Sequence, residues 1–167
     1  MDVRRKLWWC TFALFLILSI SASTQGQMAD QGAARNVAEM KFATVPGLPT
    51  RAVGSVQSGD PAKGSFILLA KAAAGCTIPW HWHTGAERLM IVSGVADVEM
   101  KDGKPVRLQA GAFAALPAHH VHQFRCERDC VFYIDSDAAF DIHYVNGQGN
   151  EISAAEALKA VKETPAG

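Results

Sequence analysis

The chain has 167 residues, of which 49% are hydrophobic and 19% are charged, with 16 basic and 16 acidic side chains. This composition excludes an intrinsically disordered chain, and the length predicts a single domain with tails. The lack of a basic excess argues against nucleic acid as a partner, because neutralising phosphates requires clustered Lys and Arg.

Residues 1–23 have the three-part pattern of a secretory signal peptide. Basic residues at 4–6 precede an uncharged apolar run over residues 7–20, and small residues follow it. This run is shorter than the roughly 20 residues that a membrane-spanning helix needs. We therefore expect cleavage after Ser23 and a secreted or periplasmic protein with no membrane association; an uncleaved anchor is the alternative.

Residues 24–40 are small and polar and predict a flexible lead-in. From residue 42 onward, short β-rich apolar runs alternate with Gly and Pro turn signals at intervals of roughly 8–12 residues. This spacing predicts an all-β domain over residues 41–147, folded as an antiparallel barrel or sandwich.

Residues 148–167 predict a short C-terminal helix followed by a tail. Ser153 and Glu156 have the spacing of a capping box that would begin the helix. Its apolar stripe steps by three residues, through Ile152, Ala155, Leu158 and Val161.

Two histidines and a glutamate, His81, His83 and Glu87, are the main candidates for chemistry. Residues two apart share one face of a strand but diverge on a helix, so the histidines indicate a strand. A turn over residues 84–86 would let Glu87 begin the next strand beside them. Two imidazoles and a carboxylate favour one divalent transition metal, namely Fe, Mn, Ni or Zn, over calcium, which prefers oxygen ligands.

A fourth ligand is expected from another strand. The segment Pro117–Phe124 is the other region dense in histidine. His120 and His122 share one strand face and His119 does not, so strand parity leaves His120 and His122 as alternatives.

Three cysteines follow the expected signal peptide: Cys76, Cys126 and Cys130. An exported protein meets oxidising conditions, and Cys126 and Cys130 would lie at the mouth of a hairpin. The sequence is compatible with a disulfide between them and also with two free thiols. Cys76 is expected to be buried.

Residues 75–94 and 111–126 resemble the two sequence motifs of the cupin superfamily. The fixed positions of the first are Gly75, His81, His83, Glu87 and Gly94, and those of the second are Gly111, Pro117 and His122. The second motif departs from the family pattern where His119 replaces a glycine and Cys126 replaces an asparagine. The resemblance implies a cupin-type, jelly-roll-like antiparallel β-barrel, with His81, His83, Glu87 and His122 as the metal ligands.

The expected pocket lies in the mouth of this barrel. By strand parity, the candidates for the pocket wall are Phe124 and Cys126, on the strand of His122, and Tyr133, on the next strand. The alternative for the two aromatic rings is that they only fill the core. Trp80 and Trp82 would lie on the opposite face of the histidine strand. Such an exposed aromatic edge would suit a subunit contact, and cupins often form dimers, so a homodimer is expected.

The expected signal peptide and the resemblance together imply an exported cupin that binds one metal ion and a small-molecule substrate or ligand. As an enzyme it would carry out a dioxygen-dependent cleavage, as in dioxygenases, or an isomerisation or decarboxylation of a small oxygenated acid. The alternatives are a non-catalytic barrel that binds a small molecule or senses metal, and a module that the metal merely stabilises.

Overall fold

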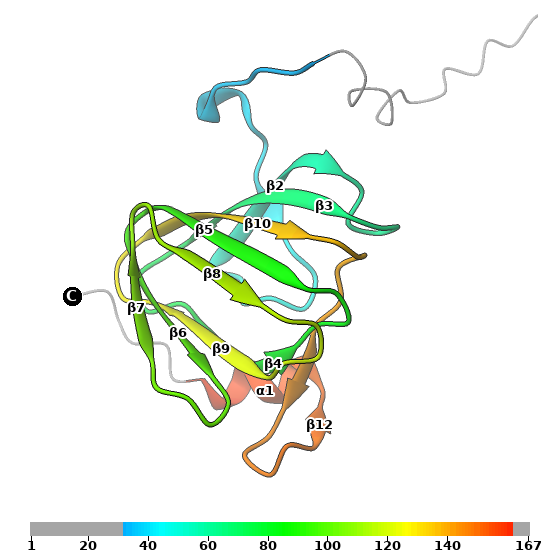
Figure 1. Cartoon of the computed structure of the whole chain (residues 1–167), viewed down its shortest axis with the longest axis vertical. Coiled ribbons are helices and arrows are strands. Elements are labelled where there is room, and N and C mark those ends of the chain that lie inside the picture. The colour runs from blue at the N-terminus through cyan, green and yellow to red at the C-terminus, as the bar shows by residue number, and fades with distance from the viewer. Residues whose placement is uncertain (1–31, 162–167) are drawn as a thin grey trace, which may run out of the picture.

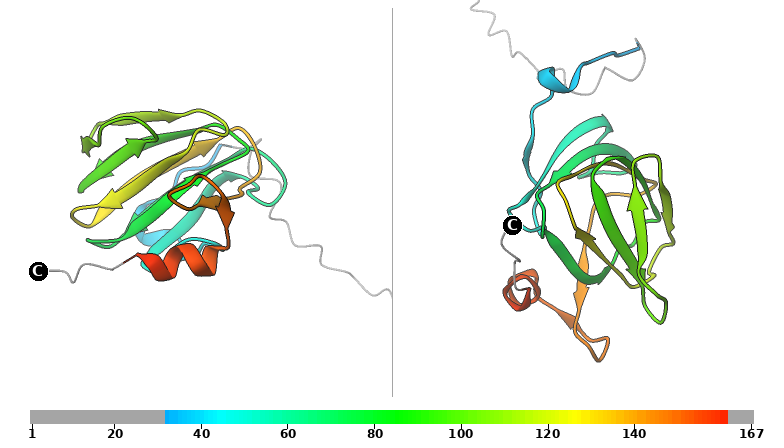
Figure 2. Two further views of the ribbon diagram at one scale, coloured as in Figure 1. Left: turned by 90° about the horizontal axis from the view of Figure 1, so that it is seen from below. Right: turned by 90° about the vertical axis from the view of Figure 1, so that its left-hand side faces the viewer.

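The computed structural model describes residues 32–161, which form two antiparallel six-stranded sheets packed face to face (Figures 1 and 2). The expected signal peptide and the first part of the lead-in lie outside the described residues. The first sheet has the spatial order β1 (Ala43–Thr44), β2 (Ala52–Gly59), β3 (Phe66–Ala72), β10 (Cys130–Ser136), β5 (Glu87–Ser93) and β8 (Phe113–Leu116). The second has the order β12 (Glu151–Ile152), β11 (His143–Val145), β4 (Thr77–Trp82), β9 (His122–Cys126), β6 (Val95–Met100) and β7 (Val106–Gln109).

The chain alternates between the two sheets through most of the domain. Strands β3 to β6 switch sheet at every step, and so do β7 to β11. Consecutive strands therefore face each other across the core instead of pairing, as in a jelly roll. The all-β prediction is confirmed; among residues 32–161 the sheets do not close into one hydrogen-bonded barrel, so the architecture is a jelly-roll sandwich.

The core lies between the inner faces of the two sheets. Alternate residues of β10 are buried, namely Cys130, Phe132, Ile134 and Ser136. On β9 the buried residues are His122, Phe124 and Cys126. This alternation follows from the two-residue period of a strand, and it places histidine and phenylalanine on the same inner surface.

The C-terminal helix α1 (Ala154–Ala160) begins where the capping pattern predicts. The Ser153 hydroxyl accepts a hydrogen bond from the Glu156 backbone N–H at 3.2 Å. The helix is shorter than its apolar stripe, because Ile152 lies in β12 and Val161 is the C-cap. In residues 32–161, no helix combines the length and apolar character that spanning a membrane demands.

The N-terminal part of the described chain projects from the sandwich, as its blue segment shows in Figure 1. It carries a single turn of 3-10 helix, η1 (Val37–Glu39), which has no buried residue. The strand β1 then pairs with β2 and ties this segment to the edge of the first sheet.

Candidate metal centre

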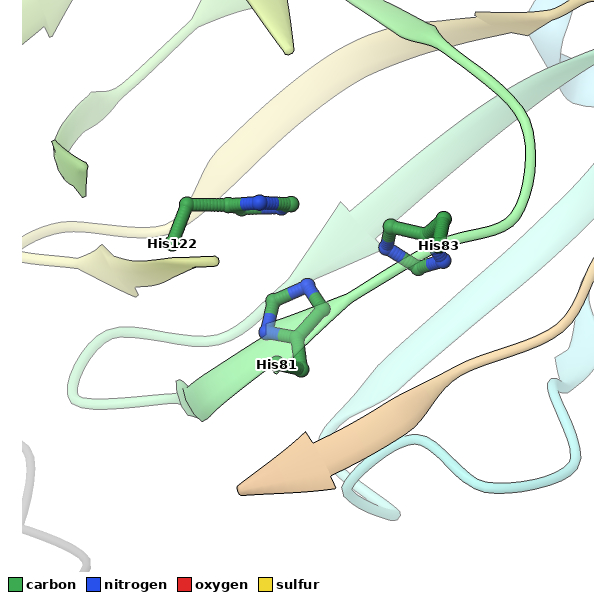
Figure 3. A group of neighbouring side chains, drawn as sticks. All are labelled: His81, His83 and His122. Atoms are coloured by element: carbon green, nitrogen blue, oxygen red, sulfur yellow. The ribbon is translucent and has the colours of Figure 1, made fainter. Parts of the chain in front are cut away.

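Three buried histidines meet between the sheets (Figure 3). His81 and His83 come from β4 and its end, and the β4–β9 ladder sets His122 directly opposite His81. The ring centroids of His81 and His122 are 4.2 Å apart, and those of His81 and His83 are 4.9 Å apart. One ring nitrogen from each histidine lies within 4.8 Å of the other two, a spacing that one metal ion can bridge.

Each of these histidines is held through its Nδ1 atom by a backbone carbonyl group. His81 Nδ1 lies 2.6 Å from the Pro79 oxygen and His122 Nδ1 lies 2.8 Å from the His120 oxygen, while His83 Nδ1 contacts the Asp141 oxygen. A carbonyl oxygen can only accept, so each Nδ1 atom carries the proton and donates it. Each Nε2 atom is therefore left with its lone pair, which is the form that ligates a metal.

Burial keeps the three imidazoles neutral. Removal from water lowers the pKa of His81 well below its ordinary value, and the mutual repulsion that protonated His122 and His83 would exert lowers it further. Burial also lowers the pKa of His83, and it lowers that of His122 to about 4. No imidazole thus has to lose a proton before it binds a metal near neutral pH.

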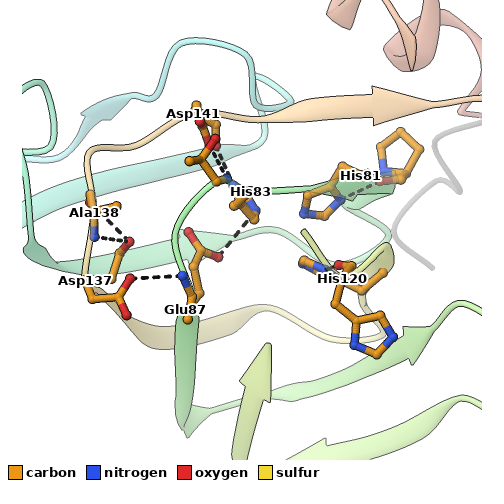
Figure 4. A network of polar contacts seen from close by, with 12 residues as sticks. His81, His83, Glu87, His120, Asp137, Ala138 and Asp141 are labelled. Atoms are coloured by element: carbon orange, nitrogen blue, oxygen red, sulfur yellow. Dashed lines mark hydrogen bonds and ion pairs between the residues drawn. The ribbon is translucent and has the colours of Figure 1, made fainter. Parts of the chain in front are cut away.

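Glu87 reaches the same place from the opposite sheet. It is the first residue of β5, as the predicted turn over residues 84–86 requires, and it is 5% exposed. The turn is tight because Gly85 passes close to the next segment: a Cβ atom there would lie 2.7 Å from the Ala138 Cβ atom. The Thr84 N–H donates to the Asp141 carboxylate and the Ala86 N–H donates to the Asp137 carboxylate, so both sides of the turn are fixed (Figure 4).

The Glu87 carboxyl is protonated at neutral pH in the metal-free protein. Burial, and then the negative charge of Asp141, raise its pKa from 4.5 to about 8. Its Oε2 atom lies 3.4 Å from His83 Nε2. Both groups are neutral at pH 7, so this contact is not an ion pair.

A cavity of about 30 Å³ adjoins these side chains. Four of its lining residues are the predicted ligands His81, His83, Glu87 and His122. The remainder of the lining is apolar: Leu48, Ile78, Leu89, Leu116, Phe124, Phe132, Ile134 and Phe140. A larger hollow of about 460 Å³ lies at the β9–β10 turn, beside Glu127 and Arg128, and none of the site histidines lines it.

Of the three residues predicted to line the pocket, one lines the cavity and two do not. Phe124 lines the cavity, whereas Cys126 is fully buried in the core beyond it. The prediction that Tyr133 lines the pocket is wrong, because β10 turns Phe132 and Ile134 inward and Tyr133 to the outer face. The apolar alternation of Phe132 and Ile134 was the sequence signal for this phase.

The two alternatives for the fourth histidine are separated by burial. His122 is 2% exposed and belongs to the cluster, while the His120 side chain is exposed and contributes only its backbone carbonyl. His119, which stands at a glycine position of the motif, has φ of 59°, so it keeps the left-handed backbone that glycine favours.

Outside the cavity, Trp82 stacks on His143 with ring centroids 3.8 Å apart. The two tryptophans of β4 are half-buried on the outer face, as strand parity predicts, and their role in a subunit contact stays a prediction. Among residues 32–161 no disulfide is present: Cys126 and Cys130 are both buried thiols.

Sequence reasoning missed the segment between β10 and β11. Its Asp141 contacts the site through a backbone carbonyl, for which no side-chain pattern exists. Phe140, from the same segment, packs against His83 with ring centroids 5.8 Å apart.

Comparisons with known proteins agree with this fold. Residues 68–135 match the family model described as a cupin domain. The comparison with curated proteins found no match.

Several solved structures share the fold at low sequence identity. An RmlC-like cupin protein from Ralstonia eutropha is 20% identical, with a TM-score of 0.56 over 77% of this chain and 83% of that chain. The polyketide cyclase RemF from Streptomyces resistomycificus is 14% identical, with a TM-score of 0.59 over 69% of this chain and 86% of that one. The DMSP lyase DddQ from Ruegeria pomeroyi is 18% identical, with a TM-score of 0.56 over 68% of this chain and 64% of the lyase, less than two thirds of its length.

Proposed function

The chain carries a cupin domain, and from this premise we propose that it is a mononuclear metalloenzyme acting on a small organic molecule. One observation carries the proposal: three buried imidazoles are each fixed at Nδ1 by a carbonyl group, and one ring nitrogen from each lies within 4.8 Å of the other two. Imidazoles that serve only in packing do not need this arrangement. The fold similarity to a lyase and a cyclase fits an enzyme, although a shared fold alone does not assign one.

The donor set fits a divalent first-row transition metal. Three neutral nitrogens from His81, His83 and His122 and one carboxylate oxygen from Glu87 would hold iron, manganese, nickel or zinc. When bound, the metal would supply Lewis acidity toward a substrate oxygen or, as iron or manganese, redox chemistry with dioxygen.

The residues of the chain prepare the site and exclude water. The carbonyl groups of Pro79, Asp141 and His120 hold the imidazoles in one tautomer. Glu87 would have to give up its carboxyl proton to serve as a ligand. The apolar side chains around the cavity keep bulk water from the reacting atoms.

The small cavity favours a second candidate function. About 30 Å³ is room for little more than one water molecule. A non-catalytic barrel that binds or senses a metal, or carries a metal-linked small molecule, needs no more space than this.

Metal content is the first test. Native protein is expected to hold about one equivalent of metal by mass spectrometry, and the His81→Ala, His83→Ala double variant is expected to hold none. The matched control is His120→Ala, whose side chain is exposed and whose backbone carbonyl the substitution keeps.

The identity of the metal then directs the activity assay. Iron or manganese leads to oxygen-consumption assays with phenolic and keto-acid substrates, and zinc or nickel to lyase or isomerase assays. A full equivalent of metal without turnover of any substrate would favour the binding function. No metal in any sample, even after reconstitution, would refute both functions.

Location and assembly belong to the same proposal. Residues 1–23 support export to the periplasm or the outside of the cell, and the half-buried tryptophans of β4 support a homodimer.

A further inference from the structure

Among residues 32–161, the wall of the cavity carries no polar side chain beyond the four predicted metal ligands. Its other eight residues are leucine, isoleucine and phenylalanine, from both sheets and from the segments at residues 48 and 140. No lysine, arginine, hydroxyl or amide side chain faces the space. A charged group brought in by a ligand would therefore be buried without a partner.

The cationic residue next to Glu87 in the sequence, Arg88, points away from the cavity. Arg88 follows Glu87 in β5, so its side chain lies on the outer face of the sheet. There it pairs with Asp135, with its Nη1 atom 3.2 Å from the Asp135 Oδ2 atom, and its Nη2 atom lies 3.9 Å from Asp137. Arg88 is thus already occupied by carboxylates and does not reach the cavity.

The remaining charges near the site are negative. Asp137 and Asp141 flank the turn that leads into Glu87. The Asp141 carboxylate accepts a hydrogen bond from the Thr84 N–H and the Asp137 carboxylate accepts one from the Ala86 N–H, so both are held next to the ligand set. Two carboxylates at this position disfavour an anionic ligand.

We infer that the substrate is a neutral and largely apolar molecule whose metal-binding oxygen atoms lie at one end, with no carboxylate or phosphate elsewhere. This inference rests on the proposed function and narrows it. It removes small carboxylic acids from the expected substrates unless the carboxylate itself binds the metal.

Leu48 and Phe140 are where such a molecule would enter. Both are partly exposed, and both belong to segments outside the strands. The other apolar wall residues are buried strand residues. A ligand larger than water has to displace these two side chains, and it would then lie against them.

The test compares two probes that differ by one carboxylate. The full chain, freed of other metals and loaded with cobalt(II), is titrated with catechol and with 3,4-dihydroxybenzoate, and binding is followed through the cobalt absorption bands and by calorimetry. We expect catechol to bind about tenfold more tightly or better, because the extra carboxylate finds no partner in the wall.

Two variants make the test specific. Leu48→Arg places a cation at the entrance and is expected to narrow or reverse the preference. Arg88→Gln removes a cation that faces outward and is expected to leave the preference unchanged.

The outcomes separate the inference from the proposed function. Cobalt-loaded protein that prefers 3,4-dihydroxybenzoate, or that binds neither probe, would overturn the inference alone. Loss of carboxylate binding in Arg88→Gln would also overturn it, because Arg88 would then serve the site. A protein that does not take up cobalt would overturn the proposed function, and the inference with it.

Discussion

Metal binding at slightly acidic pH is expected to release about one proton, and Glu87 is expected to be its source. With a pKa of about 8, the Glu87 carboxyl is almost fully protonated at pH 6.5, whereas an ordinary carboxyl of pKa 4.5 would hold about 0.01 proton there. The three imidazoles contribute less than free histidines would, because burial lowers the pKa of each. The apparent affinity for metal should therefore rise about tenfold for each pH unit up to about pH 8 and then level off.

Calorimetric titration of the metal in buffers of different ionisation enthalpy counts these protons. We expect about one proton at pH 6.5 and about 0.1 at pH 9 from this carboxyl, taken as the difference between the native protein and a Glu87→Gln variant. Subtracting the variant removes any proton lost by metal-bound water, which both proteins share. Equal release by the two proteins at pH 6.5 would refute the raised pKa of Glu87 or its role as a ligand.

Three further pairs of variants test the site and its turns. His122→Ala should lower metal affinity at least about a hundredfold, while His120→Ala should leave it unchanged, as competition with a chromogenic chelator would measure. His119→Gly should be about 1 kcal/mol more stable in urea unfolding than His119→Ala, because φ of 59° favours glycine; equal stabilities would contradict this conformation. Gly94→Ala should destabilise the protein by about 2 kcal/mol more than Gly111→Ala. Both glycines have positive φ, but of the two only Gly94 would place a Cβ atom against a carbonyl oxygen, at 2.1 Å. Similar losses of stability in the two variants would argue against this close approach.

The part of the site that depends on strand periodicity could be predicted from the sequence. The spacing of His81 and His83 required one strand face, and the glutamate four residues later required a turn before a new strand. The structure has both features, since β5 begins at Glu87. The turn residues and the alternation of β strands also sufficed to predict an all-β domain.

Strand periodicity alone does not predict which face of β10 points toward the core. Parity groups Tyr133 with Asp135, but it does not say which of the two faces meets the core. That choice is made by the partners of the strand: β10 pairs with both β3 and β5, and a register shift lies between Val131 and Phe132 on the β5 side. The local pattern agrees with this packing, because Phe132 and Ile134 alternate on the inward face and Asp135 lies on the other.

The backbone groups that fix the imidazoles could not be predicted at all. A carbonyl acceptor exists at every residue, so the sequence does not mark the oxygen of Asp141, 58 residues from His83, as the partner of its ring. The tertiary fold places the segment between β10 and β11 beside His83, and this brings the Asp141 oxygen to the site.

The buried polar cluster explains why a metal suits this fold. His81, His83, Glu87 and His122 are each at most 7% exposed, in a mostly apolar surrounding. Burying such groups opposes folding, even where one ring nitrogen is hydrogen-bonded. Apolar residues of similar size would pack there without this penalty, so stability alone does not account for the arrangement. A divalent ion would offset the penalty, because it would use all four donors at once and compensate the charge that Glu87 would gain on losing its proton.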